Sequence, residues 1–171
     1  LSKKMSLDID EMEKMLNEYL QFTSLNYLEK NETFDLSILL ENIIDKYDNP
    51  HIFKDIIPRT YINGRKSLIQ RSLNNLIDNS LKYAEKIDLR LSKKNSNLII
   101  IIDDDGPGIP ENEHENVFKP FYKIDKSRGG SKSSVGLGLS IALDTIKAHG
   151  GNILLEKSPQ DGLRVKVILP F

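Results

Sequence analysis

The most constraining feature of this chain is an apolar run that ends in three adjacent carboxylates. Residues Leu98 to Ile102 are all apolar, and four of the five are β-branched, which is typical of a strand buried on both faces. Asp103 to Asp105 follow at once, and Gly106-Pro107-Gly108 then forms a turn. Crowded like charges repel one another, and a buried carboxylate without a partner is unfavourable. Either the segment is a solvated turn, or its glycines let a flat ligand approach while one carboxylate accepts a hydrogen bond from that ligand.

The composition excludes several classes of function. The 171 residues, 39% of them hydrophobic and 29% charged, suit one soluble domain or a small domain with an appended helical piece. A net charge of −1 provides no general attraction for nucleic acid or membrane. The absence of cysteine excludes disulfides, thiolate metal sites and a cysteine nucleophile, and the three histidines lack a metal-ligand spacing. No apolar run approaches the roughly 20 residues of a transmembrane helix.

The first 30 residues have the pattern of an amphipathic helix. Its seam follows the alternating four-three spacing of a coiled coil, at Met5, Ile9, Met12, Leu16, Tyr19 and Thr23. The apolar stripe of such a helix needs another helix or a domain surface to pack against. Either the helix packs on its own domain or, as we favour, it comes from a bundle whose other helices lie outside this sequence. Because the chain begins at Leu1 within this pattern, we expect a piece of a longer protein, with residues 31–33 as the linker.

Beyond the linker, the periodicity predicts alternating helices and strands. Asp35 is a suitable N-cap for the first of these helices, and Ser158 to Gly162 is a typical hairpin turn. His149 is expected at the surface near a helix C-terminus, where the helix dipole favours its cation. Helices are predicted over 35–47, over 67–83 and from the Gly136–Leu139 segment to His149, and strands over 52–57, 60–62, 87–91, 98–102, 152–157 and 163–169.

Polar side chains form a stripe on the predicted helix 67–83. Asn75, Asn79 and Lys82 recur at i, i+4 and i+7, so they share one side of the helix. Asn is a poor helix former because its side chain competes for backbone hydrogen bonds. An amide oxygen is a suitable ligand for magnesium and an ammonium group neutralises phosphate. The stripe is therefore either solvated surface or part of a magnesium-phosphate site.

Residues 119–134 are strongly basic and almost without apolar side chains after Ile124. The cations are Lys119, Lys123, Lys126, Arg128 and Lys132, against the single acid Asp125. Such a segment cannot offset its ordering entropy by burial, so we expect it to be mobile. It is either an ordinary surface loop or a lid that orders over an anion.

Gly136-Leu137-Gly138-Leu139 then opens the helix that leads to His149. Glycines just before a helix leave its first N–H groups approachable, which favours phosphate binding. The segment is not a Rossmann fingerprint, because no strand precedes it and the third glycine is missing. It is not a Walker A loop either, because no Gly-Lys-Ser/Thr follows.

Four segments thus occur in a fixed order, and together they resemble the ATP-binding domain of bacterial sensor histidine kinases. This domain belongs to the superfamily shared with gyrase, Hsp90 and MutL (GHKL). The matching segments are Asn75 to Tyr83 for the N box, Asp104 to Gly108 for the G1 box, Phe118 to Phe121 for the F box and Gly136 to Leu139 for the G2 box. The resemblance covers about residues 34–171.

Residues 1–30 resemble the second helix of the dimerisation and phosphotransfer hairpin in these kinases. Asp8 to Glu13, followed by Tyr19-Leu20, is most similar to osmosensor kinases of the EnvZ type. The resemblance implies an α+β fold, a two-layer α/β sandwich with a mixed sheet under three helices (the GHKL or Bergerat ATP-binding fold), preceded by the hairpin helix. It implies ATP and Mg²⁺ as cofactors.

The resemblance assigns the adenine side of the site to the G1 box and its neighbours. Asp104 would accept a hydrogen bond from the exocyclic amine and so select adenine over guanine. Gly106 and Gly108 would let the backbone close on the base, Ile109 would wall the pocket and Tyr83 would pack near the adenine. Phe118, from the F box, would also belong to the ATP-binding residues.

The resemblance assigns the phosphate side to the N box, the basic segment and the G2 box. Asn79 would ligate magnesium, with Asn75 beside it. Lys82, together with Lys123 and Arg128, would neutralise phosphate charge. The N–H groups of the G2 box would hold phosphate oxygens, and its residues are Gly136, Leu137, Gly138 and Leu139.

The resemblance also implies partners and a place in the cell. The first partner is a phosphoacceptor helix, in the same subunit or in the second subunit of a homodimer. The second is the receiver domain of a response regulator. No nucleic-acid partner is implied. The domain would be cytoplasmic, in a protein anchored in the bacterial inner membrane.

Two departures from the family pattern matter. None of the three histidines lies in an H box, where a histidine is followed by an acid and soon by a proline, so we expect this chain to bind ATP without phosphorylating itself. Ser134-Val135 stands where Gly-Thr is common, which removes a hydroxyl near the phosphates and affects lid closure and affinity.

Two other readings remain open at this point. In an ATP-gated switch or ATPase like gyrase, MutL or Hsp90, a glutamate on the N-box helix would activate water, but residues 71–79 contain none and Asp78 points off the stripe. In a non-catalytic dimerisation module, the seam helix would be the functional part.

Overall fold

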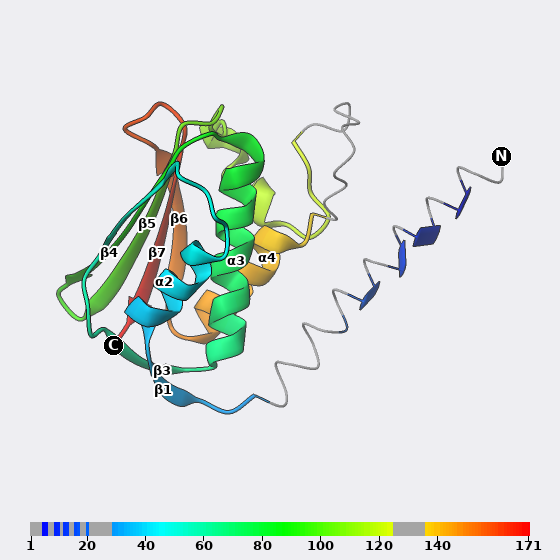
Figure 1. The fold of residues 1–171 in the computed structure, drawn as a ribbon. Helices are drawn as coiled ribbons and strands as arrows, with labels where there is room; N and C mark the ends of the chain where they lie inside the picture. The colour runs from blue at the N-terminus through cyan, green and yellow to red at the C-terminus, as the bar shows by residue number, and fades with distance from the viewer. Residues whose placement is uncertain are drawn as a thin grey trace.

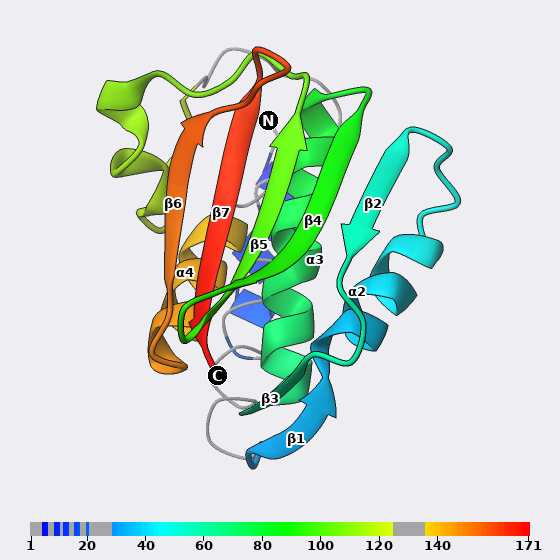
Figure 2. The same cartoon turned by 90° about the vertical axis from the view of Figure 1, so that its left-hand side faces the viewer.

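Five strands form a mixed sheet, and three helices cover one of its faces (Figures 1 and 2). The computed structural model describes residues 29–124 and 136–171, together with residues 5, 6, 9, 10, 12, 13, 16, 17 and 20. In spatial order the strands are β2 (Ile52–Ile56), β4 (Ile87–Lys94), β5 (Asn97–Asp104), β7 (Leu163–Pro170) and β6 (Asn152–Lys157). β2 pairs with β4 in parallel and the other neighbours are antiparallel. The predicted α+β class and mixed sheet are confirmed.

The helical layer consists of three α-helices, as predicted. They are α2 (Leu36–Asp45), α3 (Lys66–Tyr83) and α4 (Gly138–Ala148), and two short 3₁₀ turns, η1 (Glu111–Glu113) and η2 (Asn116–Phe118), follow the end of β5. α2 begins where it does because the carboxylate of Asp35 accepts from the N–H groups of Ser37 at 2.9 Å and Ile38 at 3.5 Å. This is the predicted N-cap.

The core lies between the helices and the inner face of the sheet. α3 contributes Leu73, Leu76 and Ile77, all fully buried. From β5, Leu98, Ile100 and Ile102 point into the same cluster. Alternation along each strand therefore separates a core face from an outer face.

The expectation that the apolar run is buried on both faces is only partly right. Ile99 is 8% exposed, but Ile101 on the same outer face is partly exposed. Figure 2 shows why: all three helices lie behind the sheet in this view. The outer side chains of β5 are covered by neighbouring strands' side chains instead of a second layer.

The predicted linker is in part a strand. β1 (Glu32–Asp35) pairs antiparallel with β3 (Tyr61–Gly64), with Glu32 opposite Gly64 and Asp35 opposite Tyr61. The sequence of this segment shows only one apolar residue, Phe34, and strand pairing with a distant segment leaves no local signal. The segment that enters the domain is therefore hydrogen-bonded along one side to β3.

The described residues of the first 20 positions are helical, as predicted. Among them Met5, Ile9, Met12 and Leu16 are each more than half exposed. The other two seam positions, Tyr19 and Thr23, lie outside the described residues. Across the described parts of the chain, none of the helices combines the length and the apolar character needed to cross a membrane.

Candidate functional site

Three of the four motif segments lie along α3: the G1 turn packs on its last residue, and the start of α4 packs beside its middle (Figure 1). Asp104, the last residue of β5, is in register with Ile87, just after α3. α3 and α4 pack against each other, and the Asn75 side chain donates from Nδ2 to the carbonyl oxygen of Gly138 at 3.2 Å. The structure thus brings the N, G1 and G2 segments together.

Asp104 is held in one orientation by two backbone donors. Its side chain is nearly buried, with 3% exposure. Its Oδ1 accepts from the N–H of Gly106 at 3.0 Å and from the N–H of Leu163 at 2.9 Å. Both bonds end on the same oxygen, so Oδ2 is the atom that can accept a hydrogen bond from a ligand.

The other two carboxylates of the run have different partners, which explains how three can be adjacent. Asp103, with 1% exposure, faces the outer side of the sheet and pairs with Arg90 and with Arg164, whose Nε lies 2.6 Å from Oδ1. Asp105 accepts through Oδ1 from the N–H groups of Glu85 and Lys86, each at 2.9 Å. These backbone donors lower the pKa of Asp105.

The glycines of the G1 segment are required by close approach and by backbone conformation. A Cβ on Gly106 would lie 2.9 Å from the Tyr83 carbonyl oxygen, so this glycine lets the turn pack on the end of α3. Gly108 has a φ of +71°, in the region that favours glycine.

Gly162 is a residue that sequence reasoning missed. It was expected only to complete the turn after β6, but a Cβ there would lie 2.1 Å from the backbone oxygen of Asp104 and 2.5 Å from its Oδ1. The same turn presents the Leu163 N–H to that Oδ1. Gly162 therefore lets the β6–β7 turn hold the Asp104 carboxylate, and its only sequence signal was a glycine within a turn.

Replacing Gly162 by Ala should displace the β6–β7 turn and disturb Asp104. We expect a loss of stability of about 1–3 kcal/mol, typical of overpacking, together with weaker ligand binding. Thermal unfolding and calorimetric titration measure the two effects. Gly150→Asn is a control, because Asn tolerates the positive φ of that glycine and the position lies at the far end of α4. Ligand binding that is unchanged in Gly162→Ala would contradict this role.

The predicted polar stripe on α3 lies beside the start of α4. Asn75 is half-buried and bonded to Gly138, so its amide joins the two helices. Asn79 is half-buried one turn further on. The ammonium group of Lys82 lies 4.9 Å from the centre of the Tyr83 ring, and both side chains are exposed.

Asp78 lies off this stripe, as predicted. It is exposed and accepts from the hydroxyl of Tyr47 at 2.7 Å. Burial, and then the hydrogen bond to Asp78, raise the pKa of Tyr47. Asp78 therefore links α2 to α3 and is not placed to activate water at the stripe.

The N-terminus of α4 has no side-chain cap among the described residues, and no acid occupies its first turn. The side chain of its N-cap residue, Leu137, is 4% exposed and belongs to the interior, so only its backbone faces the site. Leu139 is half-buried against the core. Uncapped N–H groups at a helix start suit an anion.

A backbone hydrogen bond joins the two sides of the basic segment, Phe121 and Gly136. The N–H of Phe121 donates to the carbonyl oxygen of Gly136 at 2.9 Å, and φ is +64° at Phe121 and +79° at Gly136. Of the predicted phosphate-neutralising cations, Lys123 is described and exposed, whereas Arg128 lies outside the described residues. Ser134 and Val135 lie outside them as well.

Ile109 and Phe118 connect the G1 and F segments to the core. Both are partly buried and pack against it. His114 bonds through Nε2 to the carbonyl oxygen of Ile109 at 2.9 Å, which fixes the backbone just after the G1 turn. The residues on either side of the F segment, Asn116 and Tyr122, are in turn bonded to Glu113, in the segment that follows the G1 turn.

Together, the mixed sheet, the helical layer and the clustered motif segments define a nucleotide-binding domain of the histidine kinase and GHKL type. Residues 64–171 match the family described as Histidine kinase-, DNA gyrase B-, and HSP90-like ATPase. This match covers more than half of the chain, and the chain belongs to that family.

Within the family, this chain is similar to sensor histidine kinases. It is 34% identical over 173 residues to the sensor histidine kinase GtrS of Pseudomonas aeruginosa, covering 99% of this chain and 36% of that protein. The ATP-binding domain of PrrB from Mycobacterium tuberculosis is 26% identical with a TM-score of 0.65, covering 83% of this chain and 98% of that one. The chain thus spans about a third of the length of GtrS.

The osmosensor EnvZ of E. coli is among the similar solved structures. Its histidine kinase domain is 26% identical with a TM-score of 0.62, and the match covers 81% of this chain and 88% of that domain. The family prediction is therefore confirmed. The osmosensor subtype stays a prediction.

Proposed function

We propose that this chain is the Mg-ATP-binding catalytic domain of a sensor histidine kinase. It positions the γ-phosphate of ATP for transfer to a histidine on a helix outside this chain, for onward transfer to an aspartate of a response regulator. The observation that carries the proposal is Asp104: a nearly buried carboxylate with Oδ1 held by two N–H groups and Oδ2 available to the amine of adenine. Gly106 lets the turn after Asp104 pack on the end of α3, and Gly108 supplies the positive φ of that turn.

The phosphate side of the proposal rests on α3 and the start of α4. Phosphoryl transfer asks the protein mainly for positioning and charge neutralisation. Lys82, Lys123 and Arg128 supply positive charge in this assignment, and the N–H groups from Gly136 to Leu139 donate hydrogen bonds to phosphate oxygens.

The residues of this site fit a magnesium ion that is coordinated mainly by the phosphates of ATP. Among the residues that the structure describes, no three His, Cys, Asp or Glu side chains come together to form a metal cage. Asn79 offers a neutral amide oxygen, and magnesium is usually bound through one or two protein ligands and substrate phosphates. When bound, the ion would neutralise phosphate charge, while Asn79 orients it and Asn75 holds α4 in place.

Calorimetry of the chain with a non-hydrolysable ATP analogue tests this assignment. We expect binding that depends on magnesium, and Asn79→Ala should weaken magnesium-supported binding by about tenfold, since a metal ligand or its close support is typically worth 10–100-fold. Binding without magnesium should change little. Asn63→Ala, on the exposed face of β3, is the matched control. Failure of the wild-type chain to bind the analogue at all would overturn the proposed function.

Transfer itself is tested by adding the phosphoacceptor hairpin as a separate protein. With radiolabelled ATP, label should appear on the hairpin histidine and none on this chain. Steady-state release of inorganic phosphate without the hairpin would instead support a GHKL-type ATPase.

The proposal extends to partners and location. The exposed Met5, Ile9, Met12 and Leu16 support a helix that pairs with other helices of a homodimer, with residues 1–30 as a separate unit from the domain at 34–171. In this proposal the domain is cytoplasmic, and the protein to which it belongs is anchored in the inner membrane.

A further inference from the structure

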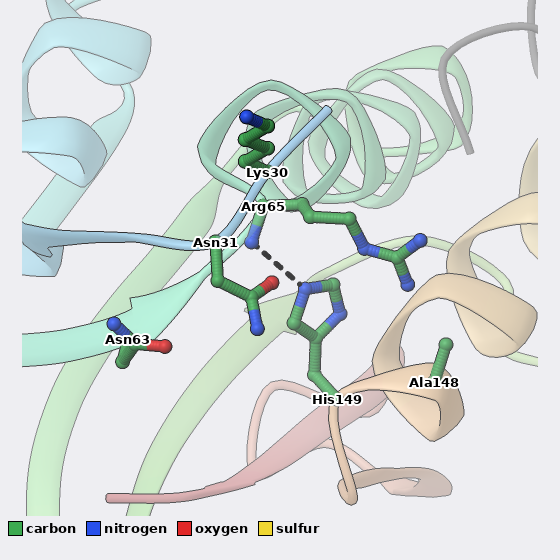
Figure 3. A pocket seen from close by; sticks show the side chains of 6 residues that line it. All are labelled: Lys30, Asn31, Asn63, Arg65, Ala148 and His149. Atoms are coloured by element: carbon green, nitrogen blue, oxygen red, sulfur yellow. Dashed lines mark hydrogen bonds between the residues drawn. The ribbon is translucent and has the colours of Figure 1, made fainter. Parts of the chain in front are cut away.

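The end of α4 is tied to the start of α3 through the side chain of His149 (Figure 3). His149 was expected to be a surface cation, and this expectation is wrong. The ring is half-buried, and Nε2 lies 3.0 Å from the backbone N–H of Arg65, the residue that begins α3. Nδ1 lies 2.7 Å from the carbonyl oxygen of Thr145. Burial lowers the pKa of His149 from its ordinary 6.5.

The two contacts require one neutral tautomer of His149. The backbone nitrogen of Arg65 can only donate, so Nε2 must accept. The carbonyl of Thr145 can only accept, so Nδ1 must carry the proton. Proton uptake on Nε2 would place an N–H against the N–H of Arg65 and remove this hydrogen bond.

Residues 29–35, which include the predicted linker 31–33 and are called the linker below, are attached at the same place. The carboxylate of Glu29 accepts from the N–H groups of Ser67 at 2.6 Å and Leu68 at 3.2 Å, so a residue of the linker caps α3 from outside the helix. Glu32 is opposite Gly64 in the β1–β3 pair. A Cβ on Gly64 would lie 2.9 Å from Cδ2 of His149, so the ring lies directly against the strand that holds the linker.

A polar cavity of about 600 Å³ opens between these parts. Figure 3 shows the His149 ring facing Asn31 of the linker and the backbone of Arg65. The cavity is also lined by Lys30, Asn63 and Ala148. Water in such a cavity gives protons direct access to the ring.

Charges on the neighbouring elements act on His149 in opposite directions. Burial has the largest effect and lowers the pKa of His149, whereas the hydrogen bond with the Thr145 carbonyl raises it; the guanidinium group of Arg65 then lowers it and the carboxylate of Glu29 raises it. The ammonium group of Lys30 lies on the wall of the same cavity. On α4 itself, Asp144 and Lys147 are exposed.

We propose that His149 is an acid-sensitive clamp: while neutral it holds the linker and the first turn of α3 against the end of α4, and a proton on Nε2 releases them. The clamp joins the C-terminal end of α4 to the start of α3, whereas the Asn75–Gly138 contact joins the start of α4 to the middle of α3. Residues 29–35 lead into the domain and are attached to β3 and to the first turn of α3, the two segments that meet at Arg65, so the charge of the His149 imidazole affects how firmly they are held.

The direction in which pH changes the stabilisation by His149 follows from its lowered pKa. A histidine that binds its proton less readily in the folded state contributes a stabilisation that is complete above the ordinary value of 6.5 and is lost as the pH falls through the lowered value. The linker should therefore be well held near neutral pH and loosened on acidification.

Amide hydrogen exchange of the whole chain at about pH 7.5 and about pH 5.0, chosen to lie on either side of the ordinary histidine value, tests the clamp. After correction for intrinsic exchange rates, protection of residues 29–35 and 64–68 should fall about three- to tenfold at the lower pH, the effect of losing one hydrogen bond. Protection of β5 and β7 should stay constant. Equal protection of the linker at two pH values above and below the one at which the His149 ring takes up its proton would overturn the proposal.

Two variants separate the clamp from general acid effects. His149→Gln supplies an amide N–H for Thr145 and an oxygen for Arg65 but does not titrate, so linker protection should no longer depend on pH. His51→Gln removes an exposed histidine and should keep the wild-type pH response. The same acid-induced loss in His149→Gln as in the wild type would contradict the clamp.

Nitrogen NMR of the histidine rings in the wild-type chain supplies a test that needs no variant. Near neutral pH, the His149 ring should carry its proton on Nδ1 and none on Nε2, and the ring should protonate below the ordinary histidine range. A ring with the proton on Nε2 would overturn the assignment whatever the exchange data.

Discussion

Replacing Asp104 by Asn is expected to reduce ATP affinity about 100-fold or more while leaving the fold intact. The amide oxygen can still accept from Gly106 and Leu163, which forces the amide nitrogen to the position of Oδ2. A donor then faces the donor amine of adenine, and an unmatched polar group in a nearly buried site is strongly penalised. Calorimetric titration with the ATP analogue measures the loss, and thermal unfolding verifies the fold.

The neighbouring carboxylate provides the control for this prediction. Asp105→Asn keeps an oxygen for the N–H groups of Glu85 and Lys86 and removes the same charge one residue away. ATP binding should remain within about threefold of the wild type, because the change is to a half-buried charge outside the adenine contact. Asp104→Asn should also bind inosine triphosphate relatively better, since that base has a carbonyl oxygen where adenine has its amine. Equal losses in both variants would contradict the assignment of Asp104 as the adenine acceptor.

Replacing Asp103 by Asn should produce the largest loss of stability among single charge changes in the described sheet. The carboxylate is 1% exposed and interacts with two guanidinium groups, those of Arg90 and Arg164. Removing one partner of a buried ion pair typically costs about 3–5 kcal/mol. Because the side chains of Arg90 and Arg164 are 43% and 22% exposed, they can regain water, and we expect about 2–4 kcal/mol. Denaturant unfolding measures this difference.

Asp161→Asn is the matched control for this loss. Asp161 pairs with Lys157 at 2.7 Å, but both side chains are exposed, at 88% and 74%. Exposed pairs contribute little, and Asn tolerates the positive φ of this position. The midpoint of unfolding should therefore not move measurably. Comparable losses in the two variants would show that net charge, and not the buried ion pair, is responsible.

Most of the fold could be predicted because its signals are local. The spacing of Leu73, Leu76 and Ile77 predicts α3, and the apolar run at Leu98 to Ile102 predicts β5, since period and burial are properties of short segments. The capping role of Asp35 was predicted on the same basis. The strand β1 could not be predicted, because its pairing with β3 depends on a segment far away in the chain.

The residues of the candidate site also fall into two groups: those predicted from local spacing and those whose contacts depend on distant segments. Asn75, Asn79 and Lys82 share a helix stripe whatever the rest of the molecule does, and the predicted stripe lies beside the start of α4. The partner of Asp104 is different: Leu163 is 59 residues away in sequence. The contact between Arg65 and His149 spans 84 residues. Neither contact has a local pattern that predicts it.

The sequence by itself determined the order of the motifs, the helices that carry them and the kind of ligand they suit, because residue type and spacing set these properties locally. Only the tertiary structure decided the separate contacts of the three adjacent carboxylates, in which Asp103 forms ion pairs, Asp104 accepts from Gly106 and Leu163, and Asp105 holds a loop. It also decided that Gly162 packs against Asp104 and that His149 contacts the backbone of Arg65. The physical reason is that charge state and orientation depend on burial and on donors brought together by folding, and these neighbours are not neighbours in sequence.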